Sequence, residues 1–221
     1  MEEELQRIPL FQLDVVLFPG MTLPLHIFEP QYREMTKMCL DCNTPFGVIL
    51  AHDARQPDSS APARIGTFAH ILDYARLPDG RYNLLTKGAG RFEVVEFVDD
   101  GSYLQAEVRA LHDIEEPGDL RELASAATEA LQAYLRIVFA QVGSEDFQIE
   151  IPDDPSELSY LIGMCLTCED CEKQEILEMR SLSRRLARGA EVLQSEAAAL
   201  RSEGALEDTE PSPRIDRSQL N

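Results

Sequence analysis

The feature that most constrains this fold is a change in hydrophobic period near residue 116. Before that point, short apolar runs are separated by turn signals such as Pro78-Asp79-Gly80. Proline presets φ and glycine accepts positive φ, so this tripeptide predicts a turn between strands. Beyond residue 116, apolar residues recur at helical spacing, from Leu120 through Leu131 to Val142. The pattern predicts a β barrel or sandwich followed by helices.

Local signals divide the chain further. Pro30 predicts the start of a short helix, and Asp154-Pro155 predicts the capped start of another. A last helical stretch is expected from Glu172 to Arg201, with a break near Ser181. We therefore expect a β-rich part over 1–115, a helical part over 116–203 and a disordered tail over 204–221, with a polar, mobile loop over 53–63.

Net charge excludes some classes of partner. The 221 residues include 40 acidic and 20 basic side chains, which gives a net charge of −20. Such a chain is repelled by phosphate backbones and by anionic membrane surfaces, so we expect no nucleic-acid or membrane partner. The sequence begins Met-Glu-Glu-Glu and contains no apolar run long enough to span a bilayer. The expected location is the cytoplasm.

The motifs of common catalytic sites are absent from the sequence. None of the three lysines, Lys37, Lys87 and Lys173, follows a phosphate-binding glycine loop. The Gly88-Ala89-Gly90 segment is expected to form a structural turn. His26 and His70 lie in strand patterns and are expected to be hydrogen-bonded structural residues. We therefore expect no catalytic residues and no cofactor.

The five cysteines form two spaced groups. Cys39 and Cys42 make one Cys-x-x-Cys unit, and Cys165, Cys168 and Cys171 make a second group. Paired units of this kind bind structural zinc when about 15–20 residues separate them. Here the separation is far longer, so we expect packed or incidental surface thiols and no metal. Cys165, Cys168 and Cys171 remain the candidate ligands of the alternative, a zinc site or a redox site.

A linked set of short motifs occupies residues 8–38. It comprises Pro9-Leu10-Phe11, Val16-Leu17-Phe18-Pro19-Gly20, Leu23-Pro24-Leu25, Ile27-Phe28-Glu29-Pro30 and Tyr32-Arg33. This pattern resembles the opening of the Lon N-terminal substrate-binding domain, and later segments as far as about residue 200 agree. The resemblance implies an α+β fold, with a PUA-like β pseudobarrel followed by a C-terminal helical subdomain. The sequence departs from the family at Gln31, where arginine is usual, and in the cysteine-rich junction.

Most residues of the family signature are expected to have structural roles. Phe28 and Tyr32 are expected in the core, and Glu29 and Arg33 are spaced to form an ion pair on a helix. The signature comprises Phe18, Pro19, Gly20, Pro24, Phe28, Glu29, Pro30, Tyr32, Arg33, Gly66, Gly90, Arg91 and Phe92.

The resemblance implies a non-catalytic binding module. Its expected partner is a protein, either an unfolded polypeptide or a specific segment, and an adaptor role in proteolysis follows from the family. Two alternatives remain open at this point. One is a docking subunit of a larger assembly, and the other is a PUA-like domain that senses a small molecule or a metal. The sequence does not fix the oligomeric state.

Overall fold

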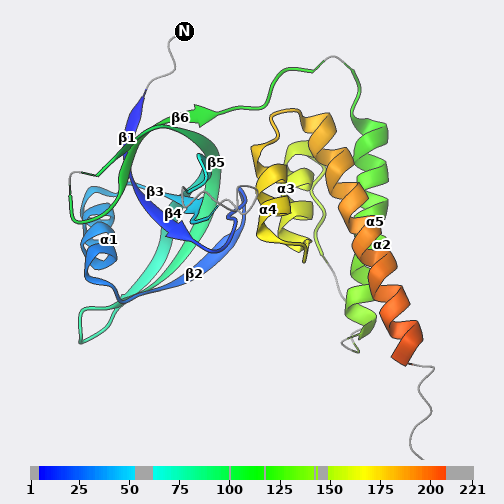
Figure 1. Cartoon of the computed structure of the whole chain (residues 1–221), viewed down its shortest axis with the longest axis horizontal. Coiled ribbons are helices and arrows are strands. Elements are labelled where there is room, and N and C mark those ends of the chain that lie inside the picture. Colours follow the sequence, from blue (N-terminus) through cyan, green and yellow to red (C-terminus); the bar gives the residue numbers. More distant parts are fainter. Residues whose placement is uncertain are drawn as a thin grey trace, which may run out of the picture.

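The computed structural model describes residues 5–52, 62–99, 101–116, 118–141, 143 and 149–207. The expected α+β fold is confirmed, with strands first and helices after them (Figure 1). The elements in chain order are β1 (Gln6–Leu13), β2 (Thr22–Ile27), α1 (Pro30–Cys42), β3 (Phe46–Leu50), β4 (Ile65–Arg76), β5 (Tyr82–Val98), β6 (Gln105–Leu111), α2 (Arg121–Gln141), α3 (Pro155–Cys165), α4 (Asp170–Glu178) and α5 (Leu182–Glu207).

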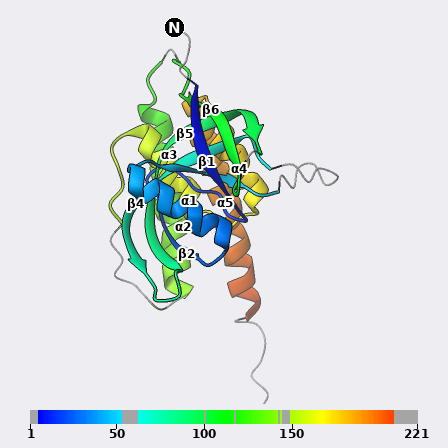
Figure 2. The ribbon, with the colours of Figure 1, turned by 90° about the vertical axis from the view of Figure 1, so that its left-hand side faces the viewer.

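The strands form one sheet that closes on itself. Its order is β2-β5-β4-β3-β1-β6, and a further pairing of β5 with β6 completes the barrel. Strand β5 has 17 residues and pairs with β2, β4 and β6, so three of the other strands are positioned directly against it. Helix α1 lies on the side of the barrel away from the other helices (Figures 1 and 2). It contributes Met35 and Cys39 to the apolar interior.

The sequence pattern wrongly predicted a turn at Gly88-Ala89-Gly90, because this segment lies inside the continuous strand β5. Gly88 is required there for a different reason. A Cβ at position 88 would lie 2.3 Å from the carbonyl oxygen of Phe18. The glycine therefore admits the backbone of the 14–21 segment, which is fixed by hydrogen bonds from Gly20 to Gly88 and from Gly88 to Met21.

The apolar run from Val15 to Phe18 is an irregular connection and not a strand. Its side chains are nevertheless buried, because the run passes between two cores. Leu17 enters the barrel interior, whereas Val16 and Phe18 pack with the helices. A Cβ on Gly163 of α3 would lie 2.5 Å from the Phe18 ring, so this glycine allows the ring to seat against the helix.

The helical subdomain follows its sequence signals closely. Asp154 caps α3 by accepting hydrogen bonds from the backbone N–H groups of Ser156 and Glu157 at 2.9 and 3.0 Å. The expected break near Ser181 is present between α4 and α5. Helix α5 continues to Glu207, beyond the expected boundary at 203. The rest of the expected tail, and residues 53–61 of the expected mobile loop, lie outside the described residues.

A buried ion cluster joins the barrel to the helices. Arg91 of β5 and Arg185 of α5 converge on Asp113, which follows β6. Arg185 donates to both carboxylate oxygens at 2.8 Å, and Arg91 donates to Oδ1. The two arginine side chains are 1% and 0% exposed.

The second positive charge of this cluster is balanced by the end of α4. Arg91 donates to the carbonyl oxygens of Leu177 and Met179 at 2.6 and 2.8 Å, and Arg185 donates to that of Met179 at 2.7 Å. The carbonyls at a helix C-terminus carry partial negative charge, so they suit a cation. The ring of Tyr160 lies 5.7 Å from the Arg91 guanidinium and 4.6 Å from that of Arg185. Strand β5, helices α3, α4 and α5, and the segment after β6 therefore meet at one point.

We expect Asp113→Asn to lower the free energy of unfolding by about 3–5 kcal/mol at pH 7, because it leaves two buried arginines without their counter-ion. Burial raises the pKa of Asp113, but the hydrogen bond and charge of Arg185, with the charge of Arg91, outweigh it and lower that pKa. The carboxylate therefore stabilises the fold above the unfolded pKa of about 3.9, and this contribution is lost as pH falls through the lower folded pKa.

Urea unfolding of both proteins between pH 3 and pH 7 checks this expectation. The difference between wild type and Asp113→Asn should be largest at pH 7 and should start to shrink toward pH 3, where the carboxyl of Asp113 in the unfolded wild-type chain takes up a proton. Asp79→Asn, which removes the carboxylate of an exposed pair with Arg81, is the matched control. Equal effects of the two substitutions at pH 7 would show that the cluster does not hold the subdomains together.

Candidate functional site

The outer face of the barrel carries an exposed group of apolar side chains on β2, β5 and β4. Pro24 of β2 and Asp73 of β4 are the partners of Leu85 of β5, and a bulge places Leu72 beside Asp73. Leu85 is 40% exposed and Leu72 is 56% exposed. Directly opposed residues have Cβ atoms about 4.5–5.5 Å apart, so these side chains form a continuous surface.

Phe28 extends this surface past the end of β2. The expectation that Phe28 lies in the core is wrong, because its side chain is 60% exposed. Strand β2 ends at Ile27, the inward-facing residue, and Phe28 stacks instead on His26, with 6.2 Å between ring centroids. His26 is held by Asn83 at 2.7 Å on the same outer face. We call Pro24, Phe28, Leu72 and Leu85 the apolar strip.

Strand β2 lies at an edge of the sheet, where its proline, Pro24, is tolerated. The backbone N–H of Gly88 donates to the carbonyl oxygen of Met21, so these two residues form a hydrogen-bonded pair. Hydrogen-bonded and non-hydrogen-bonded pairs alternate along antiparallel strands, so the pair of Pro24 with Leu85, three positions on, is not hydrogen-bonded. The backbone of position 24 therefore faces the free edge, where proline has no N–H to offer. A partner strand added at this edge would lose a hydrogen bond at its centre. The strip therefore favours contacts through side chains over strand addition.

A cleft continues the strip toward the helices. Along β5, outward-facing side chains run from Leu85 through Lys87 to Arg91, which the helices cover. The cleft lies at Lys87, between the exposed and the covered part of β5, and has a volume of about 390 Å³. It is lined by Pro19, Gly20 and Lys87 from the barrel side and by Glu150, Pro152, Glu157, Tyr160, Leu161 and Met164 from the helical side. Its apolar lining suits a large apolar side chain, with one amine and two carboxylates for polar contacts.

The signature residues lie in three places. Pro19 and Gly20 line the cleft, Pro24 and Phe28 belong to the strip, and Arg91 lies in the ion cluster. Tyr32 packs on Phe11 with 4.2 Å between ring centroids, and Pro30 begins α1. Gly66 allows the close approach of Phe92 and Val48, whereas no atom of the described residues lies within 4 Å of a Cβ at Gly90. Sequence reasoning missed Leu72, Leu85 and the α3 wall of the cleft, because no motif marks them.

The expected ion pair between Glu29 and Arg33 is not formed. Glu29 accepts a hydrogen bond from Gln31 at 2.8 Å, and Arg33 donates to the backbone oxygen of Asp79 at 3.3 Å. Gln31 is the position at which the sequence departs from the family pattern. Its side chain donates a hydrogen bond to the Glu29 carboxylate, which was expected to pair with Arg33. Arg33 instead ties α1 to the turn between β4 and β5.

The cysteine groups lie apart from this surface. Cys39 is buried in α1, Cys42 is exposed at its end, and the other group spans the α3–α4 junction. Burial raises the pKa of Cys165, and it raises the pKa values of Cys39 and Cys168 to about 11. Within the described ranges, no three His, Cys, Asp or Glu side chains are grouped so that they could hold a metal ion. No helix in the same ranges is long and apolar enough to cross a membrane.

Comparison with known proteins identifies the domain. Residues 7–195 match the family described as the ATP-dependent protease La (LON) substrate-binding domain. The chain belongs to this family. A relative, the Lon protease of Phenylobacterium zucineum, is 30% identical over 193 residues, which are 84% of this chain and 24% of the relative. The chain thus spans about a quarter of the length of the curated relatives it matches.

Solved structures agree with this assignment. The Lon N-terminal domain protein from Xanthomonas campestris has a TM-score of 0.60 and 25% identity, over 83% of this chain and 96% of the other. The N-terminal domain of Mycobacterium avium complex Lon protease has a TM-score of 0.68 over 86% of this chain and 98% of the other, and its 19% identity shows the fold alone. The LON-type fold is therefore shown, and the part of the Lon proteases that this chain resembles is the substrate-binding domain.

We expect Cys168 to react slowly with iodoacetamide at pH 7.5, because a thiol with a pKa of about 11 is almost entirely protonated there. Exposed Cys42 is the internal comparison, and mass spectrometry of tryptic peptides over time gives both rates. Metal analysis of the same sample should find well under one zinc per chain. Stoichiometric zinc that is lost in Cys168→Ala would contradict the packing interpretation of the cysteine group.

Proposed function

We propose that this LON-type domain is a non-catalytic protein-binding module that recognises exposed apolar segments of polypeptides through the apolar strip and the adjoining cleft. The observation that carries the proposal is the exposure of Phe28, Leu72 and Leu85, which lie on or beside the neighbouring strands β2, β5 and β4. Grouped apolar side chains of this kind mark sites of protein contact, whereas scattered ones do not. Family membership supports a protein substrate in general.

The dimensions of the surface indicate the length of the bound segment. Strand β2 runs for 6 residues beside the strip, and at about 3.3 Å per residue it spans about 20 Å. A short extended segment would cover this length and place one large side chain in the cleft. A flexible segment must be ordered on binding, so we expect affinities in the micromolar range or weaker.

Charge sets a second preference. The net charge of −20 repels acidic segments and raises the encounter rate of basic ones. This contribution should weaken between low and physiological salt, where the Debye length falls to about 8 Å. Burial of apolar surface is not screened in the same way, so the contribution of the strip should remain.

We expect Leu85→Ser to weaken the binding of an apolar peptide by about tenfold, because it removes the side chain at the centre of the strip. Val95→Ser is the matched control. Val95 lies on the same strand, is 44% exposed and is outside the strip. Fluorescence anisotropy with labelled peptides of matched length and differing charge, at two salt concentrations, measures both effects.

Three outcomes of that experiment separate the alternatives. Loss of peptide affinity in Leu85→Ser but not in Val95→Ser supports the strip as the binding surface. Equal losses in both variants would place recognition elsewhere and contradict the proposed surface. The absence of binding to any peptide at millimolar protein would contradict recognition of unfolded segments, and it would favour docking onto a folded partner.

The purified chain should hydrolyse neither ATP nor casein. The sequence contains no phosphate-binding loop and no nucleophile–base motif, and its family match is to the substrate-binding domain. Phosphate release and casein degradation, each measured with and without ATP, test this expectation. Turnover that co-purifies with the chain through successive columns would overturn the non-catalytic assignment.

A further inference from the structure

A second concave surface lies on the helical subdomain, away from the barrel. Helices α2 and α5 run side by side in the same direction, and α3 and α4 lie between this pair and the barrel (Figure 1). The groove has a volume of about 670 Å³ and is formed by the C-terminal halves of α2 and α5. It shares no residue with the apolar strip or its cleft. A partner bound in this groove would therefore be distinct from the segment proposed to bind at the apolar strip.

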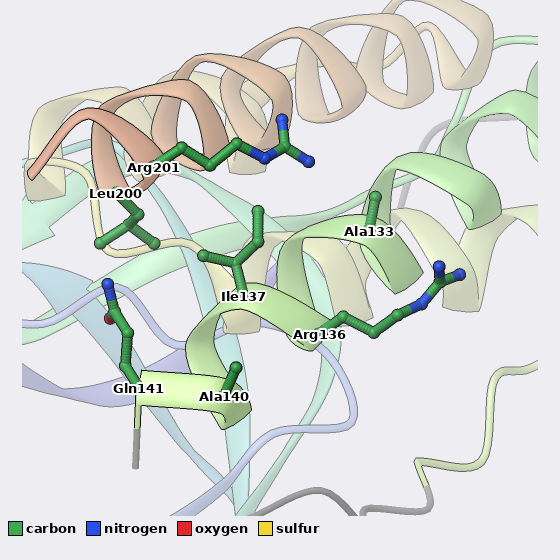
Figure 3. A pocket seen from close by; sticks show the side chains of 7 residues that line it. All are labelled: Ala133, Arg136, Ile137, Ala140, Gln141, Leu200 and Arg201. Carbon is green, nitrogen blue, oxygen red and sulfur yellow. The ribbon is translucent and has the colours of Figure 1, made fainter. Parts of the chain in front are cut away.

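The floor of the groove is apolar. Ala133, Ile137 and Ala140 repeat at helical spacing on α2, and Leu200 of α5 faces Ile137 across the groove (Figure 3). The two alanines leave room for the backbone of a partner to approach closely, while Ile137 and Leu200 provide the apolar contact. Grooves of this kind between paired helices accept the apolar face of a further helix.

The borders of the groove are positively charged. Arg136 extends from α2 and Arg201 from α5, and the lining residues that the structure describes include no carboxylate. Neither guanidinium has an ion-pair partner among the residues that the structure describes. They differ in this from exposed arginines that are paired with carboxylates, as in the pairs Arg81–Asp79 and Arg121–Asp119.

We propose that this groove docks an amphipathic helix of a partner protein whose apolar stripe is bordered by aspartate or glutamate. The stripe would pack on Ile137 and Leu200, and carboxylates at its borders would accept hydrogen bonds from Arg136 and Arg201. The net charge of the whole chain favours basic partners at long range. At contact distances the two unpaired guanidiniums dominate, because charges beyond about 8 Å are screened at physiological salt.

The test uses two labelled amphipathic peptides of about 18 residues, or roughly five helical turns. Both carry the same leucine stripe. One has glutamate at every border position and the other has lysine at those positions. Fluorescence anisotropy at physiological salt should show tighter binding of the glutamate peptide to the wild-type chain. Arg136→Glu/Arg201→Glu should weaken that binding by about tenfold or more and strengthen binding of the lysine peptide.

A matched control separates the groove from net charge. Arg121→Glu/Arg184→Glu changes the net charge equally on the same two helices, at their N-terminal ends and outside the groove. This variant should retain the wild-type preference for the glutamate peptide. An equal loss in both double variants would overturn the proposal, as would equal affinity of the wild type for the two peptides. Thermal unfolding of each variant confirms that the fold is intact.

A second copy of this chain is the competing occupant. Sedimentation velocity of the wild-type chain at about 100 μM shows whether it self-associates, and Ile137→Glu places a charge on the apolar floor of the groove. A monomeric wild type, together with loss of glutamate-peptide binding in Ile137→Glu, supports a heterologous partner. Dimers that dissociate in Ile137→Glu would identify the second copy as the occupant and overturn the proposal.

Discussion

The buried contact of Arg91 and Arg185 with Asp113 is the interaction on which the arrangement of the two subdomains depends. Charges removed from water are costly, and they are tolerated only where nearly every polar atom finds a partner. Here the carboxylate and the α4 carbonyls supply these partners, although Nε of Arg91 is buried without one among the described residues. Tyr160 contacts both guanidiniums and also lines the cleft. The cluster that joins the subdomains therefore also positions one wall of the candidate site.

A single strand links this buried junction to the exposed surface. Side chains of β5 that point away from the barrel interior change in character along the strand, from exposed Leu85 through Lys87 at the cleft to buried Arg91. Exposure decreases in this order because the helical subdomain covers β5 at Arg91 and does not reach Leu85. Because side chains alternate along a strand, a register shift of one residue in β5 would reverse which face each of them occupies. Gly88, which admits the Phe18 backbone, helps to fix that register.

The sequence predicted what depends on local signals. The change of period, the Asp154 cap and the break near Ser181 all follow from the chemistry of one or a few residues, and the structure contains each of them. The errors concern long-range contacts. Gly88 resembles a turn residue until Phe18, 70 positions earlier, is placed against it. Phe28 is a large apolar residue of the kind usually found in a core. It is exposed because β2 ends one residue earlier, at the inward-facing Ile27. The strip and the α2/α5 groove combine residues from separate elements, so no linear motif could mark them.

The distribution of charge gives the two proposed surfaces different partners. Several arginines in the described residues are paired with neighbouring carboxylates, among them Arg109, Arg121 and Arg188. The chain as a whole has a net charge of −20, so a basic flank on a segment bound at the apolar strip is favoured. At the α2/α5 groove, the described lining residues include two unpaired guanidiniums and no carboxylate, so the charge of this lining has the opposite sign. The ion cluster holds the barrel and the helices in one arrangement, and the surfaces share no residue. A basic apolar segment and an acidic amphipathic helix would therefore occupy separate places on the same domain without competing for either.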